Sequence, residues 1–145
     1  MPAGWPTIEL LTADVVSLLD RLEIESAHVV GLSLGGAVAL QLAADMPERV
    51  RSLVAVNAFA RLRGTRGSWW RGIDRLWLAA TGRMEELGRT VAAGLFPHAG
   101  QEEMRALAAA RLAGNRPWTY VKLLAAIGRF DLRDRLGEIR VPTLV

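Results

Sequence analysis

A short apolar segment that runs through a glycine-flanked bend into a helix constrains this fold more than any other feature. The residues AHVVG, 27–31, are mostly apolar, too few for a buried helix and followed by a turn signal, so they predict a buried strand. From Leu34 small and apolar residues continue to Ala44, and Pro47 ends the helix that they predict. A second predicted buried strand covers 52–58. Strand, helix and strand in succession form a βαβ unit, which implies a parallel sheet with a right-handed crossover.

The remaining chain predicts helices before and after this unit. Residues 8–22 carry one apolar stripe, and Thr7 is placed to cap the first turn. After Ala60 a polar, glycine-rich connector leads into helical patterns that extend from Ser68 to about Leu136. The segment IRVPTLV then starts a new strand. The apolar stripes of the later helices are Trp69, Ile73, Leu76 and Ala80; Met84, Leu87, Val91 and Leu95; Met104, Leu107 and Leu112; and Trp118, Val121, Leu124 and Ala125.

A helical run of this length between two strands of a parallel sheet predicts a cap inserted into an α/β core. We therefore expect a partial core in residues 1–60, a helical cap over 61–138, and the truncated start of the next core strand at 139–145.

The bend itself carries the pattern G-x-S-x-G, as Gly31-Leu32-Ser33-Leu34-Gly35, with Gly36 after it. A turn this sharp holds the central serine in a strained conformation, and glycines two residues to either side leave room for it. The hydroxyl of Ser33 then stands clear of the sheet at the positive end of the helix. The N–H of Leu34 is placed to donate to an oxyanion. A base must still take the hydroxyl proton, usually a histidine held by a carboxylate.

Three other interpretations of this motif have to be weighed. Ser33 could simply cap the helix that follows it. A dinucleotide-binding fingerprint needs a glycine where Ser33 stands and an acid after the second strand, where Asn57 stands. A phosphate-binding P-loop is excluded, because it requires a lysine that this segment lacks.

Two stretches of the chain resemble the α/β-hydrolase superfamily. AHVVGLSLGGAVALQLAADMPERVRSLVAVNA is similar to its nucleophile elbow, the following helix and the next strand, and FDLRDRLGEIRVPTLV is similar to the return from the cap into the core. The similar subgroup comprises small esterases, lactonases and cofactor-free haloperoxidase-like hydrolases. The resemblance implies that Ser33 is the nucleophile, that the Leu34 N–H is one oxyanion donor, and that a small-molecule acyl substrate is hydrolysed without a cofactor. A serine in place of an aspartate disfavours a haloalkane-dehalogenase mechanism.

The same resemblance places the second oxyanion donor before this segment and the catalytic acid and histidine after Val145. Candidates inside the chain do not replace them: His28 lies far down the first strand, His98 is in a cap loop, and Asn57 has no charge. The remaining acids are expected at helix ends or on exposed faces: Asp45, Asp74, Asp131 and Asp134. We therefore expect the chain to be a fragment of an incomplete α/β-hydrolase fold, with little activity alone. A non-catalytic hydrolase-like binding protein and a nucleotide-binding oxidoreductase are the alternatives.

Tryptophans concentrate in the expected cap. Trp69, Trp70, Trp77 and Trp118 could line an apolar acyl pocket. Aromatic stripes at helical spacing more often hold helices together, so we expect most of them to pack within the cap.

Composition narrows the other classes of function. The chain has no cysteine, which excludes disulfides and thiolate chemistry. Its arginines are interleaved with acids at helical spacing, which indicates a solvated face rather than a nucleic-acid site. No apolar run is long enough to span a membrane, and the N-terminus lacks the basic head of a secretory signal. We expect a cytoplasmic protein with no membrane or nucleic-acid partner.

Overall fold

The computed structural model describes the backbone of residues 4–62 and 66–145, and their side chains apart from those of 66–71. The chain folds as two compact units. The first comprises Met1–Arg63 and Ala125–Val145, and the second comprises Gly64–Leu124. The second unit is shorter at both ends than the helical insertion expected over 61–138.

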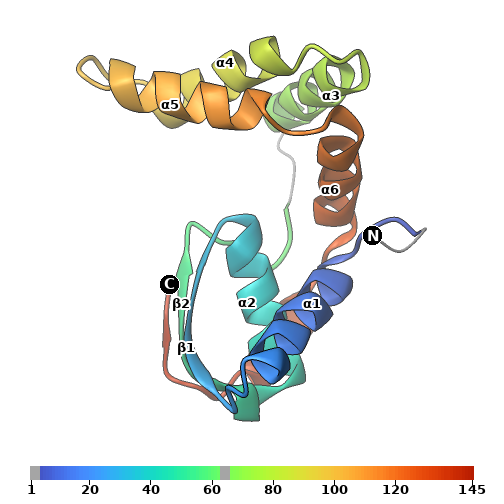
Figure 1. Cartoon of the computed structure of the whole chain (residues 1–145), viewed down its shortest axis with the longest axis vertical. Coiled ribbons are helices and arrows are strands. Elements are labelled where there is room, and N and C mark those ends of the chain that lie inside the picture. Colours follow the sequence, from blue (N-terminus) through green and yellow to red (C-terminus); the bar gives the residue numbers. More distant parts are fainter. Residues whose placement is uncertain (1–3, 63–65) are drawn as a thin grey trace. The chain divides into compact units, whose positions relative to one another are not determined.

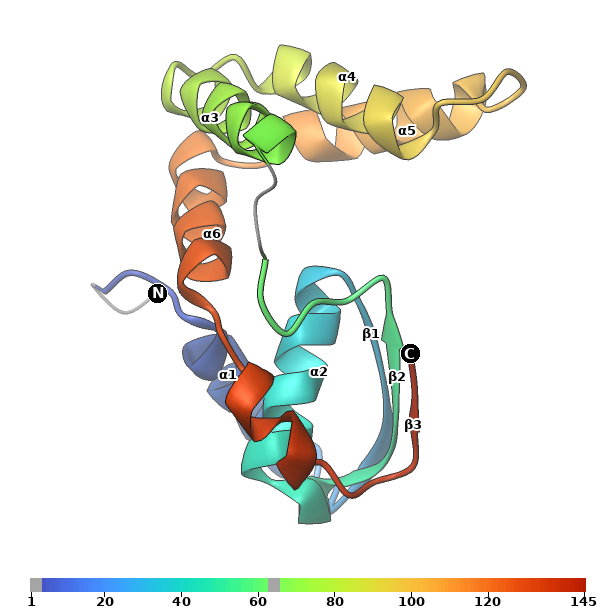
Figure 2. The same cartoon turned by 180° about the vertical axis from the view of Figure 1, so that it is seen from behind.

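The described strands of the first unit form one parallel sheet in the order β1-β2-β3 (Figures 1 and 2). Strand β1 (Ala27–Leu32) leads into helix α2 (Leu34–Asp45), and a 3₁₀ turn, η1 (Pro47–Arg49), precedes β2 (Val50–Val56). Strand β3 (Thr143–Leu144) pairs on the far side of β2. The predicted βαβ unit and its parallel sheet are therefore confirmed, with β2 beginning and ending two residues earlier than expected.

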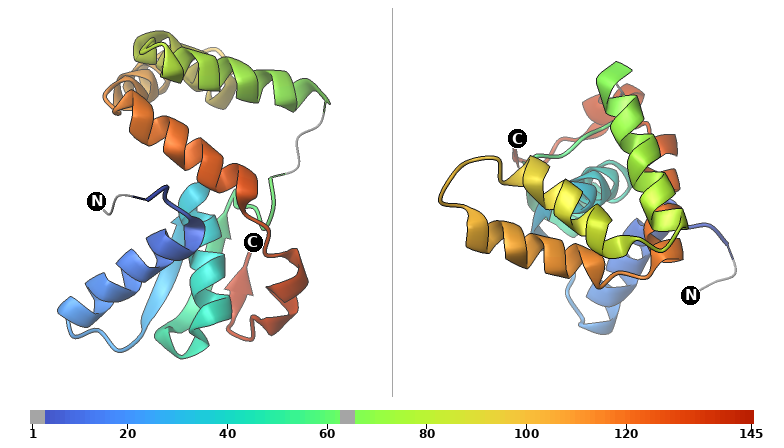
Figure 3. Two further views of the ribbon diagram at one scale, coloured as in Figure 1. Left: turned by 90° about the vertical axis from the view of Figure 1, so that its right-hand side faces the viewer. Right: turned by 90° about the horizontal axis from the view of Figure 1, so that it is seen from above.

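Helices α1 and α2 cover one face of this sheet. Helix α1 (Ile8–Arg21) begins where the sequence predicts, because the Thr7 hydroxyl accepts a hydrogen bond from the Leu10 N–H at 3.2 Å. It lies beside α2 on the same side of the strands (Figure 3). The core of the first unit is mainly aliphatic, and its largest fully buried side chains are Ile8, Leu42 and Leu53.

The opposite face of the sheet is exposed, which corrects the prediction that β1 and β2 are buried strands. Val30 and Leu32 are 70% and 65% exposed, and Val56 and Leu144 also lie at the surface. The cause is that α1 and α2 pack on one side only, so that alternate residues of each strand face away from them. Parallel sheets are usually covered on both faces.

The turn between α1 and β1 is fastened to the start of β2 by Arg49. Its guanidinium donates to the carbonyl oxygens of Glu25 at 2.7 Å and Ile24 at 3.1 Å, and it pairs with the Asp20 carboxylate at 2.7 Å. One side chain thus links the segments that precede β1 and β2, at the end of the sheet farthest from Ser33.

The second unit contains α3 (Arg66–Ala80), α4 (Met84–Leu95), α5 (Glu102–Ala113) and the first part of α6 (Pro117–Arg129). Its core is formed by Leu78, Ala79, Met84, Leu87, Val91 and Val121, with Leu112 and Tyr120 packed against it. Burial raises the pKa of the Tyr120 phenol.

Two of the predicted apolar stripes are wrong about the buried face. On α3 the expected Ile73 and Leu76 are exposed, whereas Leu78 is buried. On α5 the expected Met104 and Leu107 are exposed, because the helix meets α4 through its small residues. The stripe predicted for α4 is confirmed except at Leu95, which is exposed at the end of the helix.

Two chain segments that connect the units are joined to each other within the first unit, and we call them the neck. They are Phe59–Arg61, leaving the core, and Phe130–Leu132, returning to it. The Leu132 N–H donates to the Ala60 carbonyl at 2.8 Å, and the rings of Phe59 and Phe130 meet edge to face at 6.2 Å. Arg61 and Asp131 form an antiparallel bridge and a 3.3 Å ion pair.

The neck should weaken in acid through Asp131. A hydrogen bond from the Arg133 side chain, aided by the charge of Arg61, lowers the pKa of Asp131 to about 2. An aspartate in an unfolded chain has a pKa of about 3.9. The ionised form of Asp131 therefore stabilises the fold above that pH, and this stabilisation is lost as the pH falls toward 2. We expect Asp131→Asn to be less stable than the wild type at pH 6, with the difference disappearing between about pH 4 and pH 2.

Melting temperatures of both proteins from pH 6 to pH 2 measure this effect. Glu85→Gln is the control, because its ion pair with Arg89 is exposed and lies within one helix. A constant difference between wild type and Asp131→Asn across the whole range would contradict the assignment.

Candidate active site

Ser33 is the single residue between β1 and α2, and its backbone is strained. Its φ and ψ are 52° and −112°, a region that non-glycine residues rarely occupy. The bend is held from both sides: the Ser33 N–H donates to the Val56 carbonyl at 3.0 Å, and the Ser33 carbonyl accepts from the Ala37 N–H at 3.1 Å. The first bond ties the bend to β2, and the second starts the ladder of α2.

The hydroxyl of Ser33 does not cap the helix. Ser33 occupies the N-cap position of α2, yet its side chain makes no capping hydrogen bond, and an N-cap residue normally has extended backbone angles. The residue is exposed at the positive end of α2. The interpretation of Ser33 as a helix cap is therefore wrong for this structure.

The glycines around the bend have different roles. A Cβ added to Gly31 would lie 2.3 Å from the Gly35 carbonyl oxygen, and one added to Gly36 would lie 2.4 Å from the Ala58 Cβ. A Cβ on Gly35 would meet nothing within 4 Å. The expectation that the glycines two residues before and after Ser33 both provide room is correct for Gly31 and wrong for Gly35. The second close approach occurs at Gly36.

Leu34 is the first residue of α2, so its N–H has no acceptor within the helix. Free N–H groups at a helix N-terminus favour a negatively charged oxygen. The place of Leu34 is thus compatible with an oxyanion donor, and its role stays a prediction.

The two histidines belong to different units, and the one in the first unit, His28, is distant from Ser33. His28 is near the start of β1, and its Nδ1 shares a 2.7 Å hydrogen bond with the Ser52 hydroxyl. It precedes Ser33 by five positions along the strand, roughly 16 Å. His98 belongs to the loop between α4 and α5 in the second unit, where its N–H donates to Gln101 and its carbonyl accepts from Arg105. The His28 ring therefore has a structural partner, whereas the bonds of His98 are made by its backbone.

The four aspartates expected at helix ends or on exposed faces are ion-pair partners or surface groups in the structure. Asp45 ends α2, at the opposite end from Ser33, and pairs with Arg135 at 2.7 Å. Asp131 is held in the neck by Arg61 and Arg133. Asp74 is exposed on α3, and Asp134 is exposed in the 3₁₀ turn η2 (Arg133–Glu138).

Asn57 is the polar residue that the structure brings next to Ser33. Leu32 and Val56 are partners in the sheet register, so Ser33 and Asn57 leave neighbouring strands at the same level. Asn57 is also left-handed, with φ of 49°. The sequence identified Asn57 only as an unsuitable replacement for an acid. An asparagine directly after a predicted strand is the signal that could have indicated this turn.

The expectation that most of the four tryptophans pack within the cap is wrong for the two whose side chains are described. Trp77 and Trp118 are 53% and 65% exposed, so neither is a packed core residue of the second unit. The Arg83 guanidinium lies over the Trp77 ring, 4.7 Å from its centroid. The side chains of Trp69 and Trp70 lie outside the described residues. A substrate role for any of the four remains a prediction.

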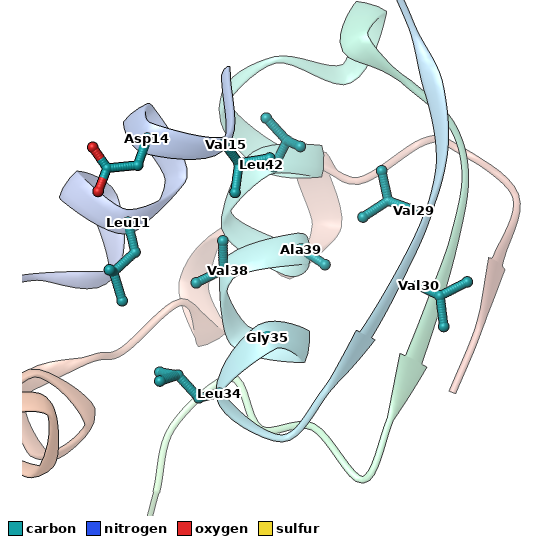
Figure 4. A pocket seen from close by; sticks show the side chains of 10 residues that line it. All are labelled: Leu11, Asp14, Val15, Val29, Val30, Leu34, Gly35, Val38, Ala39 and Leu42. Atoms are coloured by element: carbon teal, nitrogen blue, oxygen red, sulfur yellow. The ribbon is translucent and has the colours of Figure 1, made fainter. Parts of the chain in front are cut away.

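An apolar groove of about 520 Å³ opens between α1, α2 and β1 (Figure 4). Leu34 and Gly35 form the part nearest the bend, but Ser33 does not line it. Asp14 is its one charged residue, and the other side chains are aliphatic: Leu11, Val15, Val29, Val30, Val38, Ala39 and Leu42. Figure 4 also shows Val29 and Val30 on opposite sides of β1. The groove adds no polar group to the surroundings of Ser33.

Neither a metal-binding cluster nor a membrane-spanning helix occurs in the described part of the chain. No group of three or more histidine, aspartate or glutamate side chains is arranged to hold a metal ion within 4–62 and 66–145. Over the same residues, no helix combines the length and apolarity needed to cross a bilayer.

Comparison with known proteins gives a consistent family assignment. Residues 5–145 match the family described as alpha/beta hydrolase fold. A protein of Azorhizobium caulinodans named carbamate hydrolase RutD is 34% identical over 98% of this chain and 55% of its own length. The enol-lactonase structure from Burkholderia xenovorans is 30% identical, with a TM-score of 0.79 over 98% of this chain and 54% of that one.

An esterase structure from Exiguobacterium antarcticum has the same fold, with a TM-score of 0.83 at 18% identity, over 98% of this chain and 55% of that one. The chain spans about half the length of the relatives it matches.

Proposed function

Because this chain belongs to the alpha/beta hydrolase fold family, we propose that Ser33 is the nucleophile of a hydrolase acting on an ester, lactone or similar acyl bond. The observation that carries this proposal is the state of Ser33: an exposed residue, strained at φ 52°, whose hydroxyl is not used to cap α2. Backbone strain of this kind persists only where the surrounding structure enforces it, and it concentrates at functional sites.

The proposed reaction has two stages. The Ser33 oxygen forms a bond to the acyl carbon while its proton passes to a base, and the carbonyl electron pair moves onto the oxygen that the Leu34 N–H would stabilise. Collapse of this intermediate expels the protonated leaving group and leaves the acyl group on Ser33. Water then attacks the acyl carbon, which releases the acid and returns the proton to Ser33.

The names of the relatives support a substrate whose carbonyl carbon carries a leaving group. A lactone and a carbamate share a carbonyl carbon that carries a heteroatom leaving group, and proteins with both names match this chain. We propose a small molecule of this kind as substrate. Trp77 and Trp118, both exposed in the second unit, are the described tryptophans of the predicted set that can offer apolar surface to a ligand. Their exposure supports this, because exposed tryptophan is available for contact.

We expect the 145 residues alone to turn over esters slowly, because His28, the histidine of the first unit, lies at the other end of β1 from Ser33 and pairs with Ser52. This expectation sets the design of the test: a fluorophosphonate probe, which Ser33 would attack with loss of fluoride, applied with and without added imidazole. The wild-type chain should be labelled at Ser33, and imidazole should accelerate labelling by supplying the base.

Ser33→Ala should abolish the labelling, as located by mass spectrometry of peptides. Ser52→Ala is a matched control, because Ser52 has a histidine partner but lies within a regular strand. Its labelling should equal that of the wild type. Labelling that survives in Ser33→Ala, or an absence of Ser33 adduct even with imidazole, would overturn the proposal and favour a non-catalytic binding protein.

A further inference from the structure

We propose that Asn57 and Ala58 are positioning residues for Ser33, acting through the bend that they support from β2. Together with Val56 they form a segment that we call the brace. The consequence for catalysis rests on the proposed function, whereas the effect on the geometry of Ser33 does not.

The first contact of the brace is a hydrogen bond. The Val56 carbonyl accepts the Ser33 N–H at 3.0 Å, immediately after the last paired residues of β1 and β2. This bond extends the sheet by one residue, so that the position of Ser33 depends on the direction in which β2 ends.

The second contact is steric and lies one turn along α2. The space for a Cβ on Gly36 is taken by the Ala58 methyl, 2.4 Å from the ideal position, and the Ala58 Cα is 3.3 Å from it. Helix α2 can therefore approach the brace only because residue 36 has no side chain. The same Cβ would be 3.1 Å from the Gly31 carbonyl oxygen, so the contact also involves the end of β1 just before the bend.

Asn57 makes both contacts possible by its backbone conformation. Between Val56, which is still in the strand, and Ala58, which meets α2, the chain must turn sharply, and Asn57 does so at φ 49°. Asparagine tolerates this region better than other residues with a side chain, and glycine tolerates it without strain. Alanine has neither advantage, so Asn57→Ala should shift Ala58 away from Gly36 or strain the turn.

The brace is also fixed where it continues into the neck. It can therefore constrain the position of Ser33 instead of moving with it. Ala58, Phe59 and Ala60 pack against the core of the first unit, and Ala60 and Arg61 are bonded to the returning segment of the neck. The turn at Asn57 thus lies between two fixed points.

A thiol at position 33 can report this geometry without any hydrolysis. The chain contains no cysteine, so Ser33→Cys introduces a single thiol. A thiol at a helix N-terminus has a pKa below its ordinary value of about 8.5. The pH dependence of its alkylation by iodoacetamide should reveal such a lowered pKa in the otherwise unchanged chain.

Asn57→Ala in this background should raise the thiol pKa and slow alkylation at pH 7 roughly two- to five-fold, the size of a helix-terminus interaction. Asn57→Gly should restore both values, because it recovers the left-handed turn without the amide. The inference is overturned if Asn57→Ala leaves the thiol unchanged, or if Asn57→Gly is impaired as strongly as Asn57→Ala.

A methyl exchange tests the second contact. Gly36→Ala should disturb the thiol in the same direction, and adding Ala58→Gly should reverse most of the disturbance, since the clashing methyl is then removed and the remaining contacts are 3.1 Å or longer. Independent effects of the two substitutions would argue against the brace. If the brace is real but Ser33 takes no fluorophosphonate, the thiol results stand and only the proposed function fails.

Discussion

A Gly31→Ala variant is expected to lose about 3 kcal/mol of unfolding free energy, the upper part of the range for overpacking. The added Cβ would meet the Gly35 carbonyl oxygen at 2.3 Å, the Gly35 carbonyl carbon at 2.6 Å and the Gly36 Cα at 2.7 Å. All three are backbone atoms of the first turn of α2. No flexible side chain can move aside, so either β1 separates from α2 or the bend at Ser33 opens.

Gly35→Ala is the matched control, because the same methyl is added four residues away to open space. Gly35 lies in a helix, where alanine is preferred to glycine by up to about 1 kcal/mol. We therefore expect Gly35→Ala to be neutral or slightly stabilising. Urea unfolding followed by far-UV circular dichroism measures both variants. Equal midpoints for the two would show that the close approach at Gly31 is not real.

The second large effect is expected in the other unit, from Gly88→Ala on α4. Its Cβ would lie 2.4 Å from the Ala109 carbonyl oxygen and 3.3 Å from the Ala113 nitrogen, both in the backbone of α5. The two helices would have to separate, which exposes part of the core around Leu87 and Val91. We expect a loss of about 2–3 kcal/mol.

Gly94→Ala is the control within the same helix, since its Cβ would meet nothing within 4 Å. It should stabilise α4 by up to about 1 kcal/mol. Hydrogen exchange read on peptides from α4 and α5 distinguishes the variants: faster exchange in Gly88→Ala and unchanged or slower exchange in Gly94→Ala. Protection of α5 that is the same in both would refute the close contact.

Much of the first unit could be predicted from local rules. The apolar run at 27–31, the glycines after it and Pro47 located β1, the bend and the end of α2, because these residues restrict the backbone wherever they occur. The parallel sheet followed from a helix between two strands. Thr7 identified the start of α1 for the same local reason.

The candidate site was predicted only in part. The G-x-S-x-G pattern located Ser33, but it did not distinguish a capping hydroxyl from an uncapped one, because both occur before a helix. That pattern does not include Val56 or Ala58, because both follow in or after the next strand. They affect the bend at Ser33 through the place of their backbone in the fold. Their contribution depends on a register that no single segment contains.

Where the backbone extends, bends and coils could be predicted from residue types, since β-branched residues and proline restrict their own torsion angles and glycine permits angles that other residues avoid. Only the packing of the elements settled which face of α3 and α5 is buried, and which two of Gly31, Gly35, Gly88 and Gly94 leave no room for a side chain. The contribution of an apolar stripe or of a missing Cβ to stability depends on the atoms that the fold places opposite it. For Gly31 and Gly88 those atoms are another element's backbone, and for Gly35 and Gly94 there are none.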